Sequence, residues 1–184
     1  MRSVPLFLGL CALGLIWGLP LDRWAGPFPA HMIRHMGLVA IVPPILLAGL
    51  PRLPAPPILI AAIIEFAVVW GWHAPALHQA AWLSPGIYAL EQASFLAAGL
   101  LVWSSALNGR EPLAGAGGML LTSMHMTLLG ALLILSPAAL YSYCGPQDQQ
   151  IGGMLMLAIG TPAYLIAGLW LTSQALGRDP ETQP

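Results

Sequence analysis

The chain contains no lysine, and charged residues make up only 7% of its 184 positions. Its net charge is −1 and it has no basic tract, which argues against nucleic-acid binding. Its two cysteines, Cys11 and Cys144, lack the spacing of a redox or zinc motif, and we expect no disulfide between them. Nucleophile triads, phosphate loops and dinucleotide fingerprints are also missing, so nothing in the sequence supports an enzyme.

Hydrophobic residues are abundant, at 58% of the chain, and the mean hydropathy is +0.77. A membrane span needs roughly 20 apolar residues, and the sequence holds about six such runs with short connections between them. We therefore expect an all-α integral membrane protein, a bundle of about six transmembrane helices that forms a single domain over residues 1–184. The expected spans are Val4–Leu19, His31–Leu50, Pro57–His73, Ile87–Leu107, Gly117–Tyr141 and Ile151–Leu176.

The arginines predict the orientation, because loop arginine and lysine counts favour the cytoplasmic side. Four of them fall on one side of the six-span bundle, and two fall on the other. The first group is Arg2, Arg52, Arg110 and Arg178, and the second is Arg23 and Arg34. Both termini are therefore expected in the cytoplasm. The lipid bilayer is the one partner that composition implies, and a homo-oligomer stays open.

Histidines are the most informative polar residues, because side chains of this kind are costly in lipid and mark functional sites. Four of the five gather near the outer face in this orientation, and His31 and His35 lie one helical turn apart. Methionines accompany them, and imidazole with thioether suits copper, with Cu(I) favoured by the thioethers. The predicted copper ligands are His31, His35, His73, Met32, Met36, His125, Met154 and Met156.

Other interpretations of these residues stay open. The histidines can be interfacial groups bonded to backbone or water, and the methionines can simply fill gaps between helices. His78 lies in a connection and is expected to be solvated. Glu65, Glu91 and Asp148 can form a proton path, and Glu65 can instead fix the register of its helix through a buried hydrogen bond. Histidine pairs on two spans can also hold a b-type haem.

Several stretches resemble the CtaG family of cytochrome c oxidase assembly proteins. They run from about His31 to the end of the sixth expected span, and each is weak alone. The matching stretches are His31-Met32-Ile33-Arg34-His35-Met36 leading to Pro43-Pro44 and Leu50-Pro51, Trp72-His73-Ala74-Pro75, Ser94-Phe95-Leu96 through Trp103, and Asp148-Gln149 leading to Gly152-Gly153-Met154. This chain has Gln92, beside Glu91, where the resemblance would place a histidine.

The resemblance implies a role in maturing a haem–copper oxidase in a bacterial cytoplasmic (inner) membrane. It implies that the oxidase catalytic subunit is the partner, and that copper is delivered to it or retained for it. His31, His35, His73 and Asp148 are the positions that match the family's motifs. A b-haem electron carrier, a copper transporter and a metal-free assembly scaffold are the alternative functions.

Overall fold

The computed structural model describes residues 2–177, and these form helices joined by loops, without a strand. The helices are α1 (Ser3–Gly18), α2 (Leu21–Ala25), α3 (Pro27–Met36), the π-helical segment η1 (Gly37–Ile41), α4 (Val42–Gly49), α5 (Ile58–His73), α6 (Pro75–Leu83), α7 (Pro85–Asn108), α8 (Pro112–Leu135) and α9 (Pro146–Leu176). The all-helical fold predicted from composition is confirmed.

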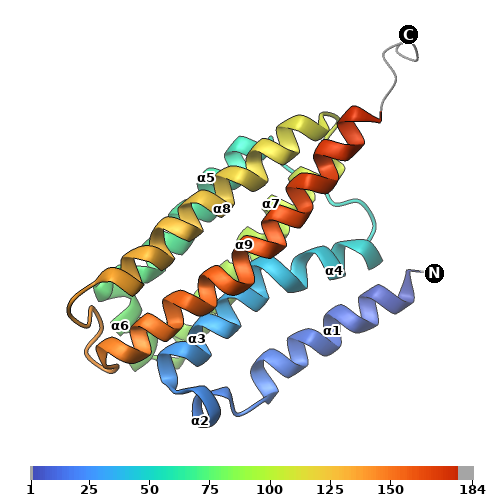
Figure 1. The fold of residues 1–184 in the computed structure, drawn as a ribbon. Coiled ribbons are helices and arrows are strands. Elements are labelled where there is room, and N and C mark those ends of the chain that lie inside the picture. Colours follow the sequence, from blue (N-terminus) through green and yellow to red (C-terminus); the bar gives the residue numbers. More distant parts are fainter. Residues whose placement is uncertain (1, 178–184) are drawn as a thin grey trace.

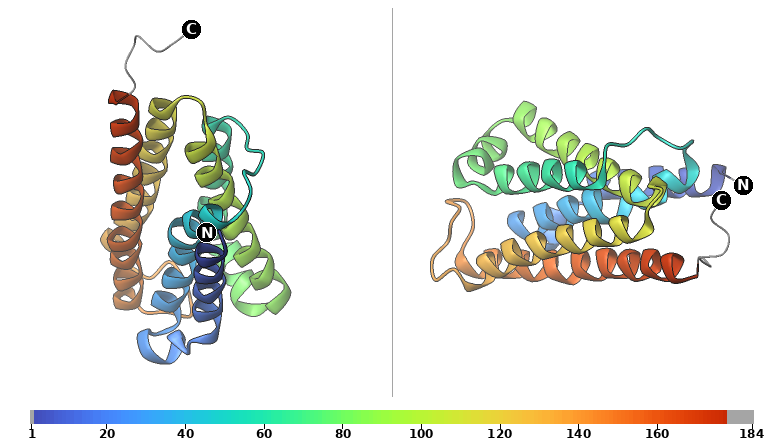
Figure 2. Two further views of the ribbon diagram at one scale, coloured as in Figure 1. Left: turned by 90° about the vertical axis from the view of Figure 1, so that its right-hand side faces the viewer. Right: turned by 90° about the horizontal axis from the view of Figure 1, so that it is seen from above.

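The helices form an elongated bundle (Figures 1 and 2). α8 packs along α9, while α5 packs against both α7 and α8. The continuous rod of α3, η1 and α4 contacts α7 and α9, and α1 lies outside it against α4. The short helices α2 and α6 lie at one end of the bundle, whereas α1 begins and α9 ends at the other (Figure 1).

Fewer helices than predicted have the length and hydropathy of a membrane span. Among the described residues four qualify, namely Pro27–Gly49, Pro85–Asn108, Pro112–Leu135 and Pro146–Leu176. A fifth is added if α5 and α6, which are bent by 71° at their junction, count as one span. α1 is apolar but only 16 residues long, below the roughly 20 that a span needs. The number six is therefore not confirmed.

The predicted orientation of the termini stays a prediction. Arg2 lies just before α1, at the end of the bundle where α9 finishes. Arg178, the last arginine on the same predicted side, lies outside the described residues.

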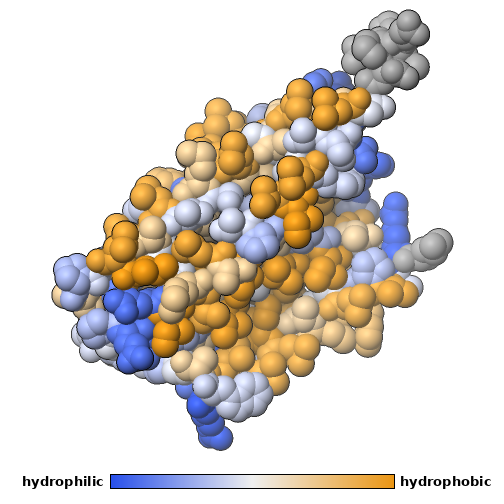
Figure 3. Space-filling view, in the orientation of Figure 1, coloured by the Kyte–Doolittle hydropathy of each residue, from blue (hydrophilic) through white to orange (hydrophobic). Residues whose placement is uncertain are grey.

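The sides of the bundle expose large apolar residues, as a lipid-facing surface requires. Phe7, Leu128 and Ile166 are each at least 60% exposed, and other exposed apolar residues lie along α1, α5, α8 and α9. On the face seen in Figure 3 hydrophobic residues spread along the bundle, and the most hydrophilic ones gather towards its ends. This distribution fits a membrane protein.

The helix predicted over Gly117–Tyr141 begins and ends earlier than expected. α8 runs from Pro112 to Leu135, and Ser136 is already extended, with ψ of 123°. Proline disfavours the helical conformation in the residue before it, so the helix ends before Pro137. The next helix starts five residues earlier than predicted, with Pro146 in its first turn, where a missing N–H costs nothing.

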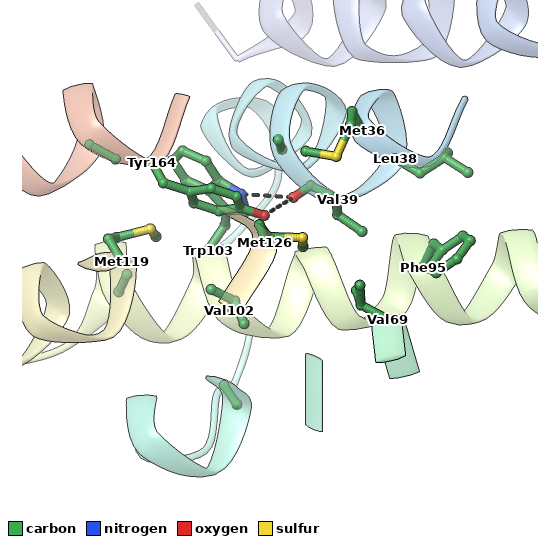
Figure 4. Close-up of a cluster of buried hydrophobic side chains, with 14 of the residues drawn as sticks. Met36, Leu38, Val39, Val69, Phe95, Val102, Trp103, Met119, Met126 and Tyr164 are labelled. Carbon is green, nitrogen blue, oxygen red and sulfur yellow. Dashed lines mark hydrogen bonds between the residues drawn. The ribbon is translucent and has the colours of Figure 1, made fainter. Parts of the chain in front are cut away.

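The proline pair of the second predicted span produces a π-helical turn. The carbonyl of Val39 would accept from residue 43 in an α-helix and from residue 44 in a π-helix, but both are prolines without an N–H. Trp103 supplies the missing donor, with its indole nitrogen 2.9 Å from the Val39 oxygen. The Tyr164 hydroxyl lies 3.4 Å from the same oxygen (Figure 4). The indole of Trp103 on α7 thus pairs the carbonyl that its own helix leaves unpaired, and Tyr164 of α9 lies beside it.

Replacing Trp103 with phenylalanine is expected to destabilise the bundle by about 1–3 kcal/mol, because it removes the main donor to a buried carbonyl. Thermal unfolding in detergent measures the effect, with Trp170→Phe as the matched control, since Trp170 is 49% exposed on the side of α9. Equal melting temperatures for the two variants would show that Val39 does not depend on the indole.

A second constraint on the same segment is the close approach of α7 at Gly99. A Cβ atom there would lie 2.8 Å from the Val39 Cα and 2.9 Å from the Leu38 carbonyl oxygen. Both neighbours are backbone atoms that cannot rotate away. The glycine therefore sets how closely α7 packs on η1.

Gly99→Ala is expected to lower stability by about 1–3 kcal/mol, as overpacking does. The control is Gly117→Ala on α8, where a Cβ meets nothing within 4 Å and the substitution should raise stability through helix propensity. Detergent melting of both variants is the measurement, and a Gly99 variant as stable as the Gly117 variant would contradict the close packing.

Candidate metal centre

Four histidines and one glutamate converge at the end of the bundle that carries α2 and α6. Four different helices supply them, and all five side chains are at most 8% exposed. We call them the histidine cluster: His31 and His35 from α3, His73 from the end of α5, His78 from α6 and Glu91 from α7. Three of the members, His31, His35 and His73, are sequence-predicted ligands.

The rings lie against one another in two pairs. The centroids of His31 and His78 are 4.6 Å apart, and those of His35 and His73 are 5.0 Å apart. His73 links the pairs, since its centroid lies 5.8 Å from both His31 and His78. All four imidazoles therefore face one small volume.

Glu91 sits between two of the imidazoles. One of its carboxylate oxygens lies 3.7 Å from His31 Nδ1, and the other lies 3.7 Å from His78 Nδ1. One ligand atom from each of these three residues can be chosen so that all lie within 4.8 Å of one another. Two ligands bound to one ion at about 2.0–2.2 Å are themselves roughly 3–4 Å apart, and the two carboxylate–imidazole distances of 3.7 Å fall in this range.

Hydrogen bonds orient two of the rings from behind. His73 donates from Nδ1 to the Val69 carbonyl, 2.7 Å away, which leaves Nε2 with a free lone pair. His78 Nε2 contacts the Tyr143 hydroxyl, which leaves Nδ1 towards Glu91. Burial raises the pKa of the Tyr143 phenol, so it stays a neutral hydroxyl, and its oxygen can accept from Nε2–H while Nδ1 keeps its lone pair. Such remote bonds commonly fix the tautomer and orientation of metal-binding histidines.

Several polar atoms that face the cluster have no hydrogen-bond partner in the described part of the chain. They are His31 Nε2, both ring nitrogens of His35, His73 Nε2, His78 Nδ1 and Glu91 Oε1. A buried polar atom without a partner costs about 1–3 kcal/mol, so a group of them in one place calls for an occupant. Imidazole and carboxylate together suit copper, zinc and similar ions.

A cavity of about 620 Å³ leads to the cluster, and His31, His78 and Glu91 form part of its wall. At its rim Arg34 donates two hydrogen bonds to Asp22, one of 3.0 Å, and this guanidinium lowers the pKa of the Asp22 carboxyl. Aromatic side chains complete the wall, including Trp17, Trp82, Tyr88 and Tyr143. An ion can therefore reach the cluster without crossing the apolar core.

The structure corrects the prediction for His78, which is 2% exposed and not solvated. Pro75 starts a new helix directly after His73, and this helix returns His78 to the bundle. Glu91 was predicted only for a proton path, yet it is the carboxylate that joins His31 to His78. Gln92, at the position where a histidine was expected, donates to Glu91 over 3.3 Å and so supports it.

The four predicted methionine ligands pack in the hydrophobic core or lie on the surface of the bundle. Met32 packs with Phe28 and Tyr141, and Met36 reaches towards Gly160 of α9. Met156 is fully buried in the main core, whereas Met154 is 50% exposed. Their role as copper ligands stays a prediction.

His125 does not join the histidine cluster. Its Nε2 lies 3.7 Å from Glu65 Oε2, in a separate group on α5 and α8. Glu65 also accepts a hydrogen bond of 2.9 Å from Tyr164, which ties α5 to α9 in the way a register-fixing carboxylate would. Asp148 lies in the first turn of α9, outside the cluster.

Comparison with known proteins adds the family. A search of curated proteins and a search of solved structures each found no significant match. The family model described as cytochrome c oxidase caa3 assembly factor matches residues 55–178, which include His73, His78 and Glu91 but not α3 with its two histidines. This match spans well over half of the chain, so the chain belongs to the CtaG family of cytochrome c oxidase assembly factors.

Proposed function

We propose that this assembly factor binds copper in the histidine cluster and passes it to the catalytic subunit of a haem–copper oxidase in a bacterial cytoplasmic membrane. One observation carries the proposal: four buried imidazoles and a carboxylate, with six unpartnered atoms, converge beneath an accessible cavity. The family supplies the oxidase as the partner. This role requires metal binding and release but no catalysed reaction.

The arrangement in two tiers suits an ion that must leave again. His31, His78 and Glu91 line the cavity, whereas His35 is fully buried against Phe95. An ion can be taken up by the first tier and can exchange one ligand at a time for those of the second. His73 contacts the rings of both tiers and would be the shared ligand. Copper that is held by exchangeable ligands is available to a partner.

The cluster also selects by chemistry. Imidazole binds copper in either oxidation state, and copper(II) is the most tightly bound divalent first-row ion at such ligands. A thioether from a nearby methionine would favour Cu(I), as predicted from the sequence. Copper binding at the histidine cluster does not require a methionine ligand.

The double substitution His31→Ala/His78→Ala is expected to remove most of the copper from the histidine cluster, because it deletes two ligands from the cavity wall. The copper that is bound by several imidazole nitrogens, measured by electron paramagnetic resonance after loading with Cu²⁺ and removal of free metal, should fall at least tenfold. Leu120→Ala is the control, since Leu120 is 62% exposed on the side of the bundle. An unchanged copper content in the double variant would overturn the site.

The substitution Glu91→Gln distinguishes a copper-binding role in oxidase assembly from a metal-free scaffolding role in cells. It keeps the shape and the packing of the side chain but removes the charge that would balance a cation. Oxidase activity should fall while the amount of assembly factor in the membrane stays constant. Glu111→Gln, which lies at the N-terminal cap of α8, is the matched control. Normal oxidase activity in both the Glu91 variant and the histidine double variant would favour a metal-free scaffold. A Soret band in the absorption spectrum of the purified protein would favour haem binding.

A further inference from the structure

A second group of unpartnered polar atoms lies deeper in the bundle than the histidine cluster. Glu65 precedes His73 by eight residues on α5, which corresponds to about 12 Å along a helix. It faces His125 of α8, and Thr122 lies one turn before His125 on the same helix; these three side chains are at most 7% exposed. Glu65 Oε2, both ring nitrogens of His125 and the Thr122 hydroxyl all lack a hydrogen-bond partner in the described residues.

The distance between Glu65 and His125 does not fit a direct hydrogen bond. Glu65 Oε2 and His125 Nε2 are 3.7 Å apart, whereas a nitrogen–oxygen hydrogen bond spans about 2.7–3.2 Å. Two ligand atoms on one small metal ion lie roughly 3–4 Å apart, given bond lengths of about 2.0–2.2 Å. The gap therefore has the width of an ion held between a carboxylate and an imidazole.

Neighbouring side chains hold both groups in this orientation. Tyr164 donates to Glu65 Oε1 over 2.9 Å, which turns the other oxygen towards His125. Phe66 packs edge-to-face with the His125 imidazole, with ring centroids 5.4 Å apart. Ligating carboxylates are commonly hydrogen-bonded through their second oxygen in the same way. Tyr164 is itself fixed against Val39 of the π-helical segment (Figure 4).

The pair also has its own access from the side of the bundle. A groove of about 730 Å³ lies between α5 and α8, and His125 is part of its wall. Its remaining wall is mainly apolar and includes Ile63, Met124 and Leu128, each more than half exposed. This groove is distinct from the cavity above the histidine cluster, with which it shares no lining residue.

We propose that Glu65 and His125 form a second metal site, which takes a divalent first-row transition-metal ion and is reached laterally through the groove between α5 and α8. Imidazole and carboxylate are ligands for such ions, and Thr122 lies one turn from His125 on the same face of α8. A side chain of a membrane partner would complete the coordination through the groove. This site does not depend on whether the histidine cluster carries copper.

The test uses Cu²⁺ as the probe, because it is bound most tightly by nitrogen and oxygen ligands among these ions. The chain has five histidines, so replacing His31, His35, His73 and His78 with alanine leaves His125 as the sole imidazole. The full-length variant is purified in detergent with a tag that contains no histidine. Electron paramagnetic resonance then reports how many imidazole nitrogens bind the ion.

The expected result is one bound Cu²⁺ with a single imidazole nitrogen in the quadruple variant. Adding Glu65→Gln or His125→Gln should weaken this binding at least tenfold, whereas Ser123→Ala in the same groove should leave it unchanged. Absence of Cu²⁺ binding by the folded quadruple variant, or binding that is indifferent to both substitutions, overturns the proposal.

If the quadruple variant does not fold, the same two substitutions are made in the otherwise unchanged chain. There each should reduce bound Cu²⁺ by one equivalent and leave the signal from several nitrogens at the histidine cluster. An undiminished number of equivalents overturns the second site. If the unsubstituted protein shows the single-nitrogen signal but no multi-nitrogen signal, the proposed function is contradicted and this second site still stands.

Discussion

The missing N–H groups of Pro43 and Pro44 are the constraint on which the interior of the bundle depends. They leave the Val39 carbonyl without a partner on its own helix, in a region where water is not available to replace one. Trp103 donates to this oxygen from α7, and Tyr164 of α9 lies 3.4 Å from it while donating its own proton to Glu65 of α5. One backbone defect thus links α7, α9 and α5 to the rod that carries the first two histidines.

The same constraint helps to explain how a buried polar centre is tolerated. His31 and His35 precede the π-helical segment, and Gly99 brings α7 close to that segment. Glu91 lies eight residues before Gly99 on α7, so the close packing of these helices also fixes the height at which the carboxylate meets the imidazoles. The position of the ligands therefore follows from backbone contacts in the apolar core.

Much of the fold follows from the sequence, because apolar runs, short connections and breaking prolines are local properties. The meeting of His31, His35 and His73 was also predictable, since all lie near one end of their helices. His78 and Glu91 were harder to assign, because the turn at Pro75 and the pairing of α6 with α7 depend on tertiary packing. Methionine ligands could not be placed from spacing alone, since a thioether fills the core as readily as it binds metal. The number six is not confirmed, because α1 has only 16 residues and α5 is bent by 71° against α6, so neither helix alone has the length of a span.

The two polar groups differ in how they meet the surroundings, and this difference bears on how an assembly factor can act. The histidine cluster opens into a cavity with an ion pair at its rim, whereas the Glu65–His125 pair adjoins a groove lined with exposed apolar side chains. The cavity therefore meets whatever surrounds the end of the bundle, whereas a membrane-embedded partner can approach the groove from its side.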